Sequence, residues 1–487
     1  MTIPRPLLLA AAVLLAARSA APADDLRFDL PVMASWTASP SNSVTLAWER
    51  PEAAPATLSW VSLDAPDAVP FVLDLPPARR HVVPLADLLP ATTYAYTVSD
   101  ATGPVRSGRF RTAPATPDVP FRFVFWTDLQ GGLDPDAART VADAVAARAP
   151  DFVTSAGDLS DYRYASDYPA AVDSWRQFFS IASNLLAVSV FEPVTGNHDE
   201  PENPDSLWFR MMELPGNERS YVFDVGPIRF IGIDNAEFEV PARVPWLARQ
   251  LQAAAADPAV RFVIPITHRP PHSWGERGGQ GNVREWFCPL FTRYEASLVL
   301  SGHAHTYQRT NPIDGVPYLV SGGAGGRLYP VDPSRPEIAF ATSCYHFVEF
   351  EWKPSENTLF LTARDAAGNP FDTAAFTPFR AVRFSPPFPR RGETCTITYD
   401  PSRGPLADEP EIFLHLGRDE FRHVHSTNPM TRQPDGTYTA TFTVPTTPKW
   451  NLAFCFCTPD KKRWDNNHAL NWQILLQPDF PASLPAP

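Results

Sequence analysis

The sequence predicts a multidomain chain: an N-terminal all-β sandwich, a central layered α/β domain and a C-terminal all-β sandwich. Its 487 residues are enough for about three domains. Short alternating apolar runs at both ends are typical of antiparallel strands, whereas the middle alternates apolar runs with Ala-rich stretches. The 55 prolines indicate many turns and edges rather than long helices.

Residues 1–23 have the pattern of a cleaved signal peptide. Arg5 provides the basic start, residues 7–17 form an unbroken apolar run, and the small residues 21–23 provide a cleavage site. The run is too short for a spanning helix, which needs about 20 apolar residues. The pattern therefore predicts a secreted or periplasmic protein with no membrane span.

Residues 24–114 predict the first sandwich. Short runs such as 44–48 alternate in polarity, and 89–98 has the pattern of a strand entered through a tyrosine corner. This segment resembles fibronectin type III domains. A Pro-rich link, 113–117, follows it.

Residues 118–380 predict the α/β domain, and 384–480 the second sandwich. In the former, strand-like runs such as 121–126 alternate with helical stretches at 137–149 and 246–256. In the latter, Thr-rich and aromatic runs follow turn signals, as at 437–442 after the turn 434–436.

The net charge limits the possible binding partners, and the number of cysteines bears on disulfide pairing. A formal net charge of −13 opposes binding to duplex nucleic acid or anionic lipid. The five cysteines are an odd number for an oxidising compartment. Cys395 with Cys455 or Cys457, and Cys288 with Cys344, are candidate disulfides, and plain core residues are the alternative.

Six polar residues of the central domain follow strand-like runs, where the ends of neighbouring strands meet in one crevice. They are Asp128, Asp158, Asn197, His268, His303 and His305. Carboxylates can bridge two ions, imidazoles bind through one nitrogen, and an amide oxygen adds no charge. One aspartate after a strand is usually a turn or helix cap, but the ordered set predicts a metal site.

The order of these blocks resembles the calcineurin-like metallophosphoesterases, and within them the purple acid phosphatases. The blocks are Asp128, Gly157-Asp158, Gly196-Asn197-His198-Asp199, His268 and Gly302-His303-Ala304-His305. The resemblance covers residues 119–350 and implies a four-layer α/β fold, a β-sandwich flanked by helices.

The resemblance also implies residue roles. Asp158 would bridge two metal ions, with Asp128 and His305 on the first and Asn197, His268 and His303 on the second. His198 would protonate or stabilise the leaving group, and Asp199 would orient its imidazole. Two ions of Fe, Zn or Mn would clamp the phosphate and lower the pKa of a bound water toward about 7, which supplies a hydroxide for in-line attack.

Two positions depart from the family pattern. Many members have His two residues after the first Asp, where this chain has Gln130; purple acid phosphatases have Tyr three residues after the bridging Asp, where this chain has Asp161. Tyr162 stands one place later. Gln130, Asp161 or water must therefore complete the first metal site, and without a phenolate on ferric iron no purple colour is expected.

Other polar groups in the central domain are open to two interpretations. Asn197 and His272 are candidates for substrate contact, although His272 also fits a surface loop. Asp161 fits a helix cap as well as a ligand. The glycine run 322–326 fits a tight turn at the sheet edge, or backbone amides near a phosphate.

The last domain resembles the starch-binding modules of secreted amylases, over residues 386–478. Trp450, Trp464 and Trp472 are the candidate carbohydrate-binding residues, with Asn466 and Asn467 as hydrogen-bond partners. A plain sandwich with tryptophans in its core is the alternative. His423 and His425 can share a strand face but are too few for a metal site.

Together these features predict a secreted, acid phosphatase-like binuclear metallohydrolase acting on a small phosphomonoester. A phosphodiesterase or nucleotidase is the enzymatic alternative, since the same metal pair serves both. The other alternative is a carbohydrate-binding protein with a degenerate phosphatase domain. The number of convergent polar groups argues against it.

Overall fold

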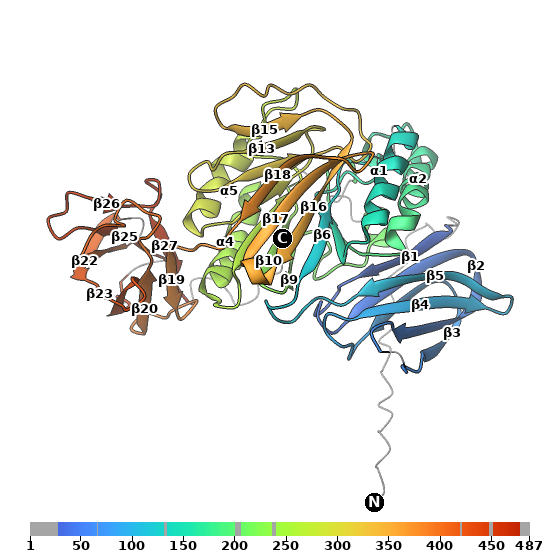
Figure 1. The fold of residues 1–487 in the computed structure, drawn as a ribbon, viewed down its shortest axis with the longest axis horizontal. Coiled ribbons are helices and arrows are strands. Elements are labelled where there is room, and N and C mark those ends of the chain that lie inside the picture. The colour runs from blue at the N-terminus through green and yellow to red at the C-terminus, as the bar shows by residue number, and fades with distance from the viewer. Residues whose placement is uncertain are drawn as a thin grey trace, which may run out of the picture.

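The computed structural model describes residues 28–65, 67–130, 134–199, 206–235, 240–418, 421–447 and 451–477. The predicted signal peptide and Trp450 lie outside these residues. Within the described ranges, every helix is too short or too polar to cross a bilayer. The chain is multidomain and mostly β, as predicted, with its three parts arranged side by side (Figure 1).

The N-terminal part consists of five strands. They are β1 (Leu30–Ser35), β2 (Val44–Ser62), β3 (Phe71–Leu85), β4 (Thr93–Asp100) and β5 (Gly103–Arg111). The start of β2 pairs with β1 and its end with β4. The hydroxyl of Tyr94 accepts a hydrogen bond from the Leu89 amide at 2.9 Å, which confirms the predicted tyrosine corner.

The central part contains two sheets. The strands of the first are β6 (Phe121–Phe125), β7 (Phe152–Ser155), β8 (Val190–Pro193), β16 (His346–Lys353), β17 (Thr358–Asp365) and β18 (Pro370–Phe376). Those of the second are β9 (Tyr221–Val225), β10 (Ile228–Ile233), β11 (Phe262–Thr267), β12 (Val299–Ser301), β13 (Tyr307–Thr310), β14 (Tyr318–Ser321) and β15 (Ile338–Thr342). The first sheet continues into the N-terminal strands, because β1 pairs with β8 at Ala34 and Val190.

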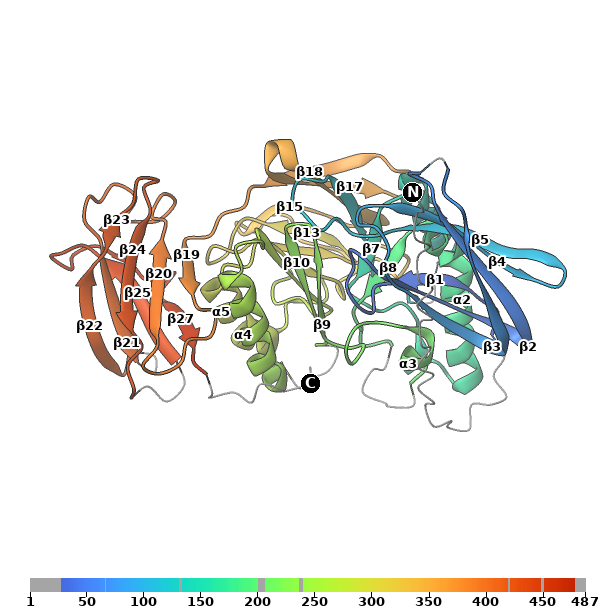
Figure 2. The ribbon, with the colours of Figure 1, turned by 90° about the horizontal axis from the view of Figure 1, so that it is seen from below.

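Helices cover the outer faces of both sheets, which gives the predicted four layers (Figures 1 and 2). They are α1 (Pro135–Arg148), α2 (Tyr168–Leu186), α3 (Trp208–Met211), α4 (Val240–Ala256) and α5 (Gly281–Arg293), with 3₁₀ turns η1 (Tyr162–Tyr164) and η2 (Pro354–Glu356). Helices α1 and α2 pack together beside the first sheet, and α4 and α5 beside the second. Asp134 and Asp167 cap α1 and α2 by accepting backbone N–H bonds.

The C-terminal part is a sandwich of two antiparallel sheets. One contains β19 (Val382–Ser385), β20 (Thr394–Tyr399), β23 (Thr431–Arg432) and β24 (Tyr438–Thr443); the other contains β21 (Phe413–Arg418), β22 (His423–Pro429), β25 (Asn451–Cys457), β26 (Trp464–Asp465) and β27 (Trp472–Leu475). All five cysteines are free, and Cys395, Cys455 and Cys457 are buried, so the core interpretation holds in this structure.

The C-terminal sandwich packs directly against the central part of the chain. Its apolar core is continuous with residues of α4 and α5. At the junction the fully buried Gln252 donates to the carbonyls of Pro387 and Leu475, and its Oε1 accepts from the Leu475 amide and the Tyr294 hydroxyl. Every hydrogen-bonding group of this amide is therefore engaged across or beside the interface.

Candidate metal centre and active site

The predicted ligands converge where the two central sheets meet. Strands β6, β7 and β8 run parallel, as do β11 and β12, so their carboxyl ends point to one edge. Each predicted ligand follows one of these strands, and all six are buried: Asp128, Asp158, Asn197, His268, His303 and His305. The topology thus brings the whole set together.

Two glycines allow the loops after β7 and β8 to touch. Gly157 has φ +96°, and a Cβ on it would lie 2.0 Å from the Gly196 amide nitrogen. A Cβ on Gly196 would lie 2.1 Å from the Asp158 nitrogen. Side chains are therefore excluded here by backbone contact, which fixes Asp158 and Asn197 relative to one another.

A Gly196→Ala variant is expected to lower the midpoint of thermal unfolding and to lose bound metal. The added methyl group meets backbone atoms that cannot turn aside, at a cost of about 3 kcal/mol. Calorimetry and metal analysis check this. Gly281→Ala at the start of α5 is the control, since its nearest neighbour is an Arg284 side-chain atom at 3.9 Å. Equal behaviour of the two variants would contradict the packing argument.

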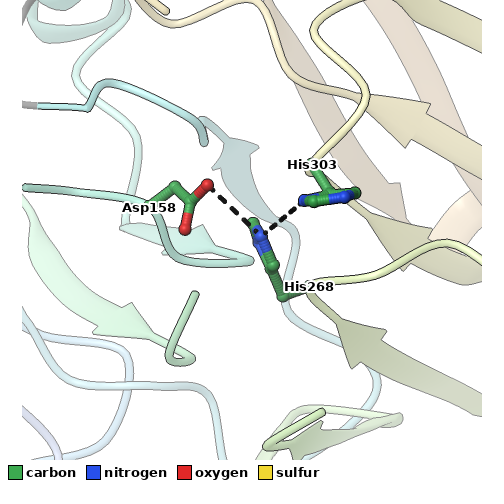
Figure 3. Close-up of side chains that lie close together, drawn as sticks. All are labelled: Asp158, His268 and His303. Atoms are coloured by element: carbon green, nitrogen blue, oxygen red, sulfur yellow. Dashed lines mark hydrogen bonds and ion pairs between the residues drawn. The ribbon is translucent and has the colours of Figure 1, made fainter. Parts of the chain in front are cut away.

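The first cluster of possible ligands consists of Asp158, His268 and His303 (Figure 3). Nε2 of His268 is 3.3 Å from Oδ2 of Asp158 and 3.1 Å from Nδ1 of His303. It is also 2.9 Å from Oδ1 of Asn197. The two imidazole rings and the carboxylate come from different strand ends and lie around a common centre.

The second cluster consists of Asp128, Asp158 and His305. Nε2 of His305 is 3.5 Å from Oδ1 of Asp128, and its Nδ1 is 2.6 Å from the Arg327 carbonyl. Asp158 belongs to both clusters, so its carboxylate is placed to bridge two ions. The order of residues had implied the same sharing.

The donor set fits cations. Nδ1 of His268 is 2.9 Å from the Ala156 carbonyl, and it must donate there because the carbonyl only accepts. Its Nε2 then faces the oxygens of Asp158 and Asn197, which are also acceptors. This arrangement requires a positive charge between these atoms, and a metal ion provides it by replacing a proton.

The pKa values show the same demand for positive charge. Burial would raise the pKa of Asp158, but His268 and His198 bring it well below its ordinary value. Burial would lower the pKa of His268, yet Asp158 raises it above the ordinary value. Burial, with the charges of His268 and Arg269, lowers the pKa of His303, which keeps that imidazole neutral and able to ligate.

Four residues of the site have left-handed backbone conformations. Asp128, Gln130, Asp158 and His303 have φ of 66°, 52°, 53° and 67°. Such conformations cost of the order of 1 kcal/mol or more for non-glycine residues and collect at functional sites. Asp128 is held by the Gly157 carbonyl and by Gly326, whose amide donates to the Asp128 carbonyl at 2.8 Å.

Gln130 lies within the second cluster. Its Nε2 position is 3.1 Å from Nε2 of His305, 3.0 Å from Nε2 of His198 and 3.5 Å from Oδ2 of Asp158. The two ends of a side-chain amide are assigned from its surroundings, and a cation here would be met by the oxygen end. Of the two side chains expected to substitute for the missing ligand, Gln130 lies at the second cluster and Asp161 lies at His198.

Asp161 and Asp199 differ from their predicted roles. Oδ1 of Asp161 is 2.5 Å from Nδ1 of His198, so Asp161 orients this imidazole. Asp199, expected to do so, instead accepts backbone N–H bonds from residues 158, 159, 160 and 196. The prediction for Asp199 was wrong because a fully buried carboxylate satisfies the nearest amides first.

His272 and the glycine run lie behind the site. His272 packs on Tyr318, with its Nε2 3.7 Å from Sγ of Cys288, and burial lowers its pKa to about 4. The structure does not bring it to the metal clusters. Within the run, Gly322 and Gly326 lie against Asp128 and His305, whereas Gly323 lies against His346 and Gly325 against Ala138. The two outer glycines thus allow close approach to the ligands.

A cavity of about 300 Å³ opens over the clusters. Its walls are Gln130, Tyr164, Asn197, His198, Arg269, Arg277, His303, His305 and Tyr329. No sequence pattern indicated Tyr164, Arg269, Arg277 and Tyr329. Tyr164 lies on η1, and the other three lie on loops. Arg269 lies at the floor, with Nη1 3.2 Å from Nε2 of His303.

In the C-terminal sandwich the three tryptophans predicted to bind carbohydrate differ in their burial. Trp472 is buried, 5.1 Å from the Phe456 ring, which contradicts a sugar-stacking role. Trp464 is half-buried and packs at 5.2 Å on His415, which stacks at 5.4 Å on Phe421. Trp450 is outside the described residues.

The two asparagines predicted to form hydrogen bonds with a sugar, Asn466 and Asn467, also differ in their surroundings. Asn467 donates to the Thr292 carbonyl of the central part, so it serves the interface rather than a sugar. Asn466 is exposed. His423 and His425 are exposed on β22, and the metal-ligand clusters found among the described residues do not include them.

The fold and these clusters define a metallophosphoesterase-type domain. Residues 121–307 match the family of calcineurin-like phosphoesterases. A purple acid phosphatase from yellow lupin seeds has the same fold, with a TM-score of 0.58, 17% identity, and coverage of 72% of this chain and 74% of that one. The chain therefore contains a calcineurin-like phosphoesterase domain whose homologues include purple acid phosphatases.

Curated relatives match part of the chain. Human acid phosphatase type 7 is 27% identical over 257 residues, 48% of this chain and 57% of that protein. An uncharacterized Mycobacterium tuberculosis protein is 24% identical over 272 residues, 47% of this chain and 50% of its own. The chain thus spans about half the length of these relatives. Separately, 91 residues are 35% identical to an alpha-amylase of Clostridium acetobutylicum, covering 19% of this chain and 12% of that protein.

Proposed function

We propose that this chain is a binuclear, metal-dependent, acid phosphatase-like phosphoesterase that hydrolyses phosphomonoesters. The observation that carries the proposal is the sharing of Asp158 by two ligand clusters whose members His303 and His305 line one cavity. That cavity also contains a positive side chain, Arg269, and an imidazole, His198. When bound, two ions of Fe, Zn or Mn would supply Lewis acidity at phosphate oxygens and an activated water.

The residues of the chain divide the remaining tasks. Asp128, Gln130 and His305 would hold one ion, and Asn197, His268 and His303 the other, with Asp158 between them. Arg269 stands beside His303, where its guanidinium can bind a phosphate oxygen.

His198 would supply the proton that the leaving group needs. Its Nδ1 is fixed by Asp161, and its Nε2 faces the cavity beside Gln130. Burial lowers the pKa of His198, but Asp158 and then Asp161 raise it above the ordinary value. A protonated imidazole at this position is suited to general-acid catalysis.

A monoester suits this cavity better than a diester. Arg269 lines it beside His303, and a phosphomonoester brings a charge of about −2 near neutral pH, whereas a diester brings −1. This guanidinium group therefore favours the more highly charged ester. A phosphodiesterase or nucleotidase is the competing assignment.

The test is metal analysis together with hydrolysis of phenyl phosphate and of diphenyl phosphate. Two ions per chain and faster turnover of the monoester are expected. No turnover after loading with manganese, zinc or iron would overturn the proposal and favour a degenerate domain. Faster turnover of the diester would favour the phosphodiesterase assignment.

An Asp161→Asn variant is expected to shift the alkaline limb of the kcat/KM profile to lower pH. The neutral amide removes one of the charges that raise the pKa of His198, so the acid form of the imidazole is lost at lower pH. Rate measurements from pH 4 to 10 check this. Asp173→Asn on α2, an exposed carboxylate, is the control. An unshifted limb would mean that His198 is not the titrating acid.

We propose a second function, glycan binding by the C-terminal sandwich. Two observations favour it: the aromatic group of His415, Phe421 and Trp464, and the resemblance of residues 386–478 to starch-binding modules. An alpha-amylase also matches 91 residues of the chain. Aromatic faces stack on sugar rings. Retention on insoluble starch, lost in Trp464→Ala and kept in Trp286→Ala, tests it; Trp286 on α5 is 41% exposed. Unretained wild-type protein would refute starch as the ligand.

We also propose export, with cleavage after residue 23. The pattern of residues 1–23 is the support. N-terminal sequencing of protein from the periplasm or medium tests this, and an intact Arg5 there would contradict it.

A further inference from the structure

The mouth of the cavity carries one positive side chain that the hydrolysis proposed above does not need. Arg277 lies on the loop between β11 and α5 and is exposed. Its guanidinium carbon is 5.4 Å from the centre of the Tyr329 ring, and Nη2 is 3.4 Å from the Tyr329 hydroxyl. Tyr329 in turn stacks on the ligand His305 at 4.8 Å.

Arg277 is thus one side chain further from the metal clusters than Arg269. Nη1 of Arg269 is 3.2 Å from His303 itself, whereas the guanidinium of Arg277 contacts Tyr329, which stacks on His305. A phosphate on the floor of the cavity would meet Arg269 first. Arg277 would face whatever the phosphate is attached to.

The loop that carries Arg277 is held in place. The carbonyl of Arg277 accepts from Oγ of Ser273 at 2.9 Å, and this hydroxyl accepts from Nε2 of Gln308 at 3.0 Å. Oε1 of the same buried glutamine accepts from the Trp274 amide at 2.8 Å. Gln308 on β13 therefore fixes the backbone under Arg277, and a fixed charge loses less entropy on binding than a mobile one.

Arg277 forms no ion pair with a carboxylate in the described part of the chain, although the charge of the neighbouring Glu276 acts on it. The ion pairs recorded there include Arg148, Arg309 and Arg364, and Arg277 forms none among them. In a chain of net charge −13, a positive group at the mouth of the cavity stands out. Tyr164, on the cavity wall beside His198, and Tyr329 add aromatic surface to the same opening.

We propose that Arg277 selects phosphoesters whose leaving group carries a second anionic group. The inference rests on the proposed phosphoesterase function and names the substrate class of that site: a phosphate bound at the floor beside Arg269, and a carboxylate or further phosphate bound by Arg277 at the mouth. An aromatic or sugar ring between them would lie between Tyr164 and Tyr329.

The test compares ligands that differ only in that second charge. 4-Carboxybenzylphosphonate and 4-carbamoylbenzylphosphonate are titrated into metal-loaded protein by calorimetry, and the matching 4-carboxyphenyl and 4-carbamoylphenyl phosphates are used for kcat/KM. A solvent-facing ion pair is worth up to about 1 kcal/mol, or about fivefold. We expect wild type to prefer each charged ligand by about fivefold.

Variants assign the preference to one side chain. Arg277→Gln is expected to abolish the preference, and Arg277→Lys to keep part of it. Arg139→Gln on α1, which removes the same charge from an exposed site, should keep all of it. A preference that survives in Arg277→Gln, or is absent in wild type, overturns the inference.

The two readouts separate this inference from the proposed function. Selective phosphonate binding without hydrolysis would contradict the phosphoesterase and leave the selectivity of Arg277 standing. Hydrolysis of both phosphates at the same relative rate in wild type and Arg277→Gln would support the phosphoesterase and contradict the selectivity of Arg277.

Discussion

An Asp158→Asn variant is expected to lose both metal ions and to hydrolyse phosphomonoesters slower by about 10³-fold or more. The carboxylate belongs to both ligand clusters, and its Oδ1 also accepts the His198 amide at 2.8 Å. An amide has one oxygen and no charge, so it cannot bridge two cations. Metal content per chain, measured with turnover, checks both losses.

Asp167→Asn is the matched control for that variant. Asp167 caps α2 by accepting the Ala170 amide at 2.9 Å, and asparagine is an equally good cap. This control should keep two ions and wild-type turnover. Retention of two ions by Asp158→Asn would mean that the two clusters do not share this residue as their bridge.

A His198→Ala variant is expected to keep its ions but to lose about 10²- to 10⁴-fold in kcat. His198 is outside both ligand clusters, yet it lines the cavity with its ring fixed by Asp161. If it protonates the leaving group, the loss is large for phenyl phosphate and small for 4-nitrophenyl phosphate, whose leaving group needs no proton. Turnover of this pair of esters measures the difference.

His423→Ala, an exposed histidine on β22, should match wild type with both esters. An equal loss with both esters in His198→Ala would show that the residue binds phosphate instead of donating a proton. Loss of metal ions from His198→Ala would place His198 among the metal ligands.

The metal clusters could be predicted because strand ends are visible in sequence. The predicted run at 121–126, before Asp128, matches β6 to within one residue. Strands β7 and β11 likewise end shortly before Asp158 and His268. Parallel topology then brings any polar residue at these ends to one edge.

Partners in loops could not be predicted in the same way. Asp199 is the residue next to His198, whereas Asp161 is 37 residues away in sequence, and the path of the loop decides that Asp161 reaches Nδ1. Arg277 and Tyr329 carry no periodic signal either. Their approach depends on the fold of two separate loops.

The burial of single aromatic residues could not be predicted from the sequence either. Trp464 and Trp472 have similar surroundings in sequence, but β27 turns Trp472 into the core while Trp464 stays half-buried on β26. A helix start was missed for a related reason. Helix α4 begins at Val240, before Pro245, because the buried Leu247 and Leu251 sustain it past a residue that removes one backbone bond.

The junction at Gln252 limits how this protein can have been assembled. Removing the C-terminal sandwich would uncover apolar faces of α4 and α5 and leave the buried amide of Gln252 without the Pro387 and Leu475 carbonyls. A module joined by a linker can be gained, lost or exchanged between genes as a unit. This one shares its core with its neighbour, so the two must change together.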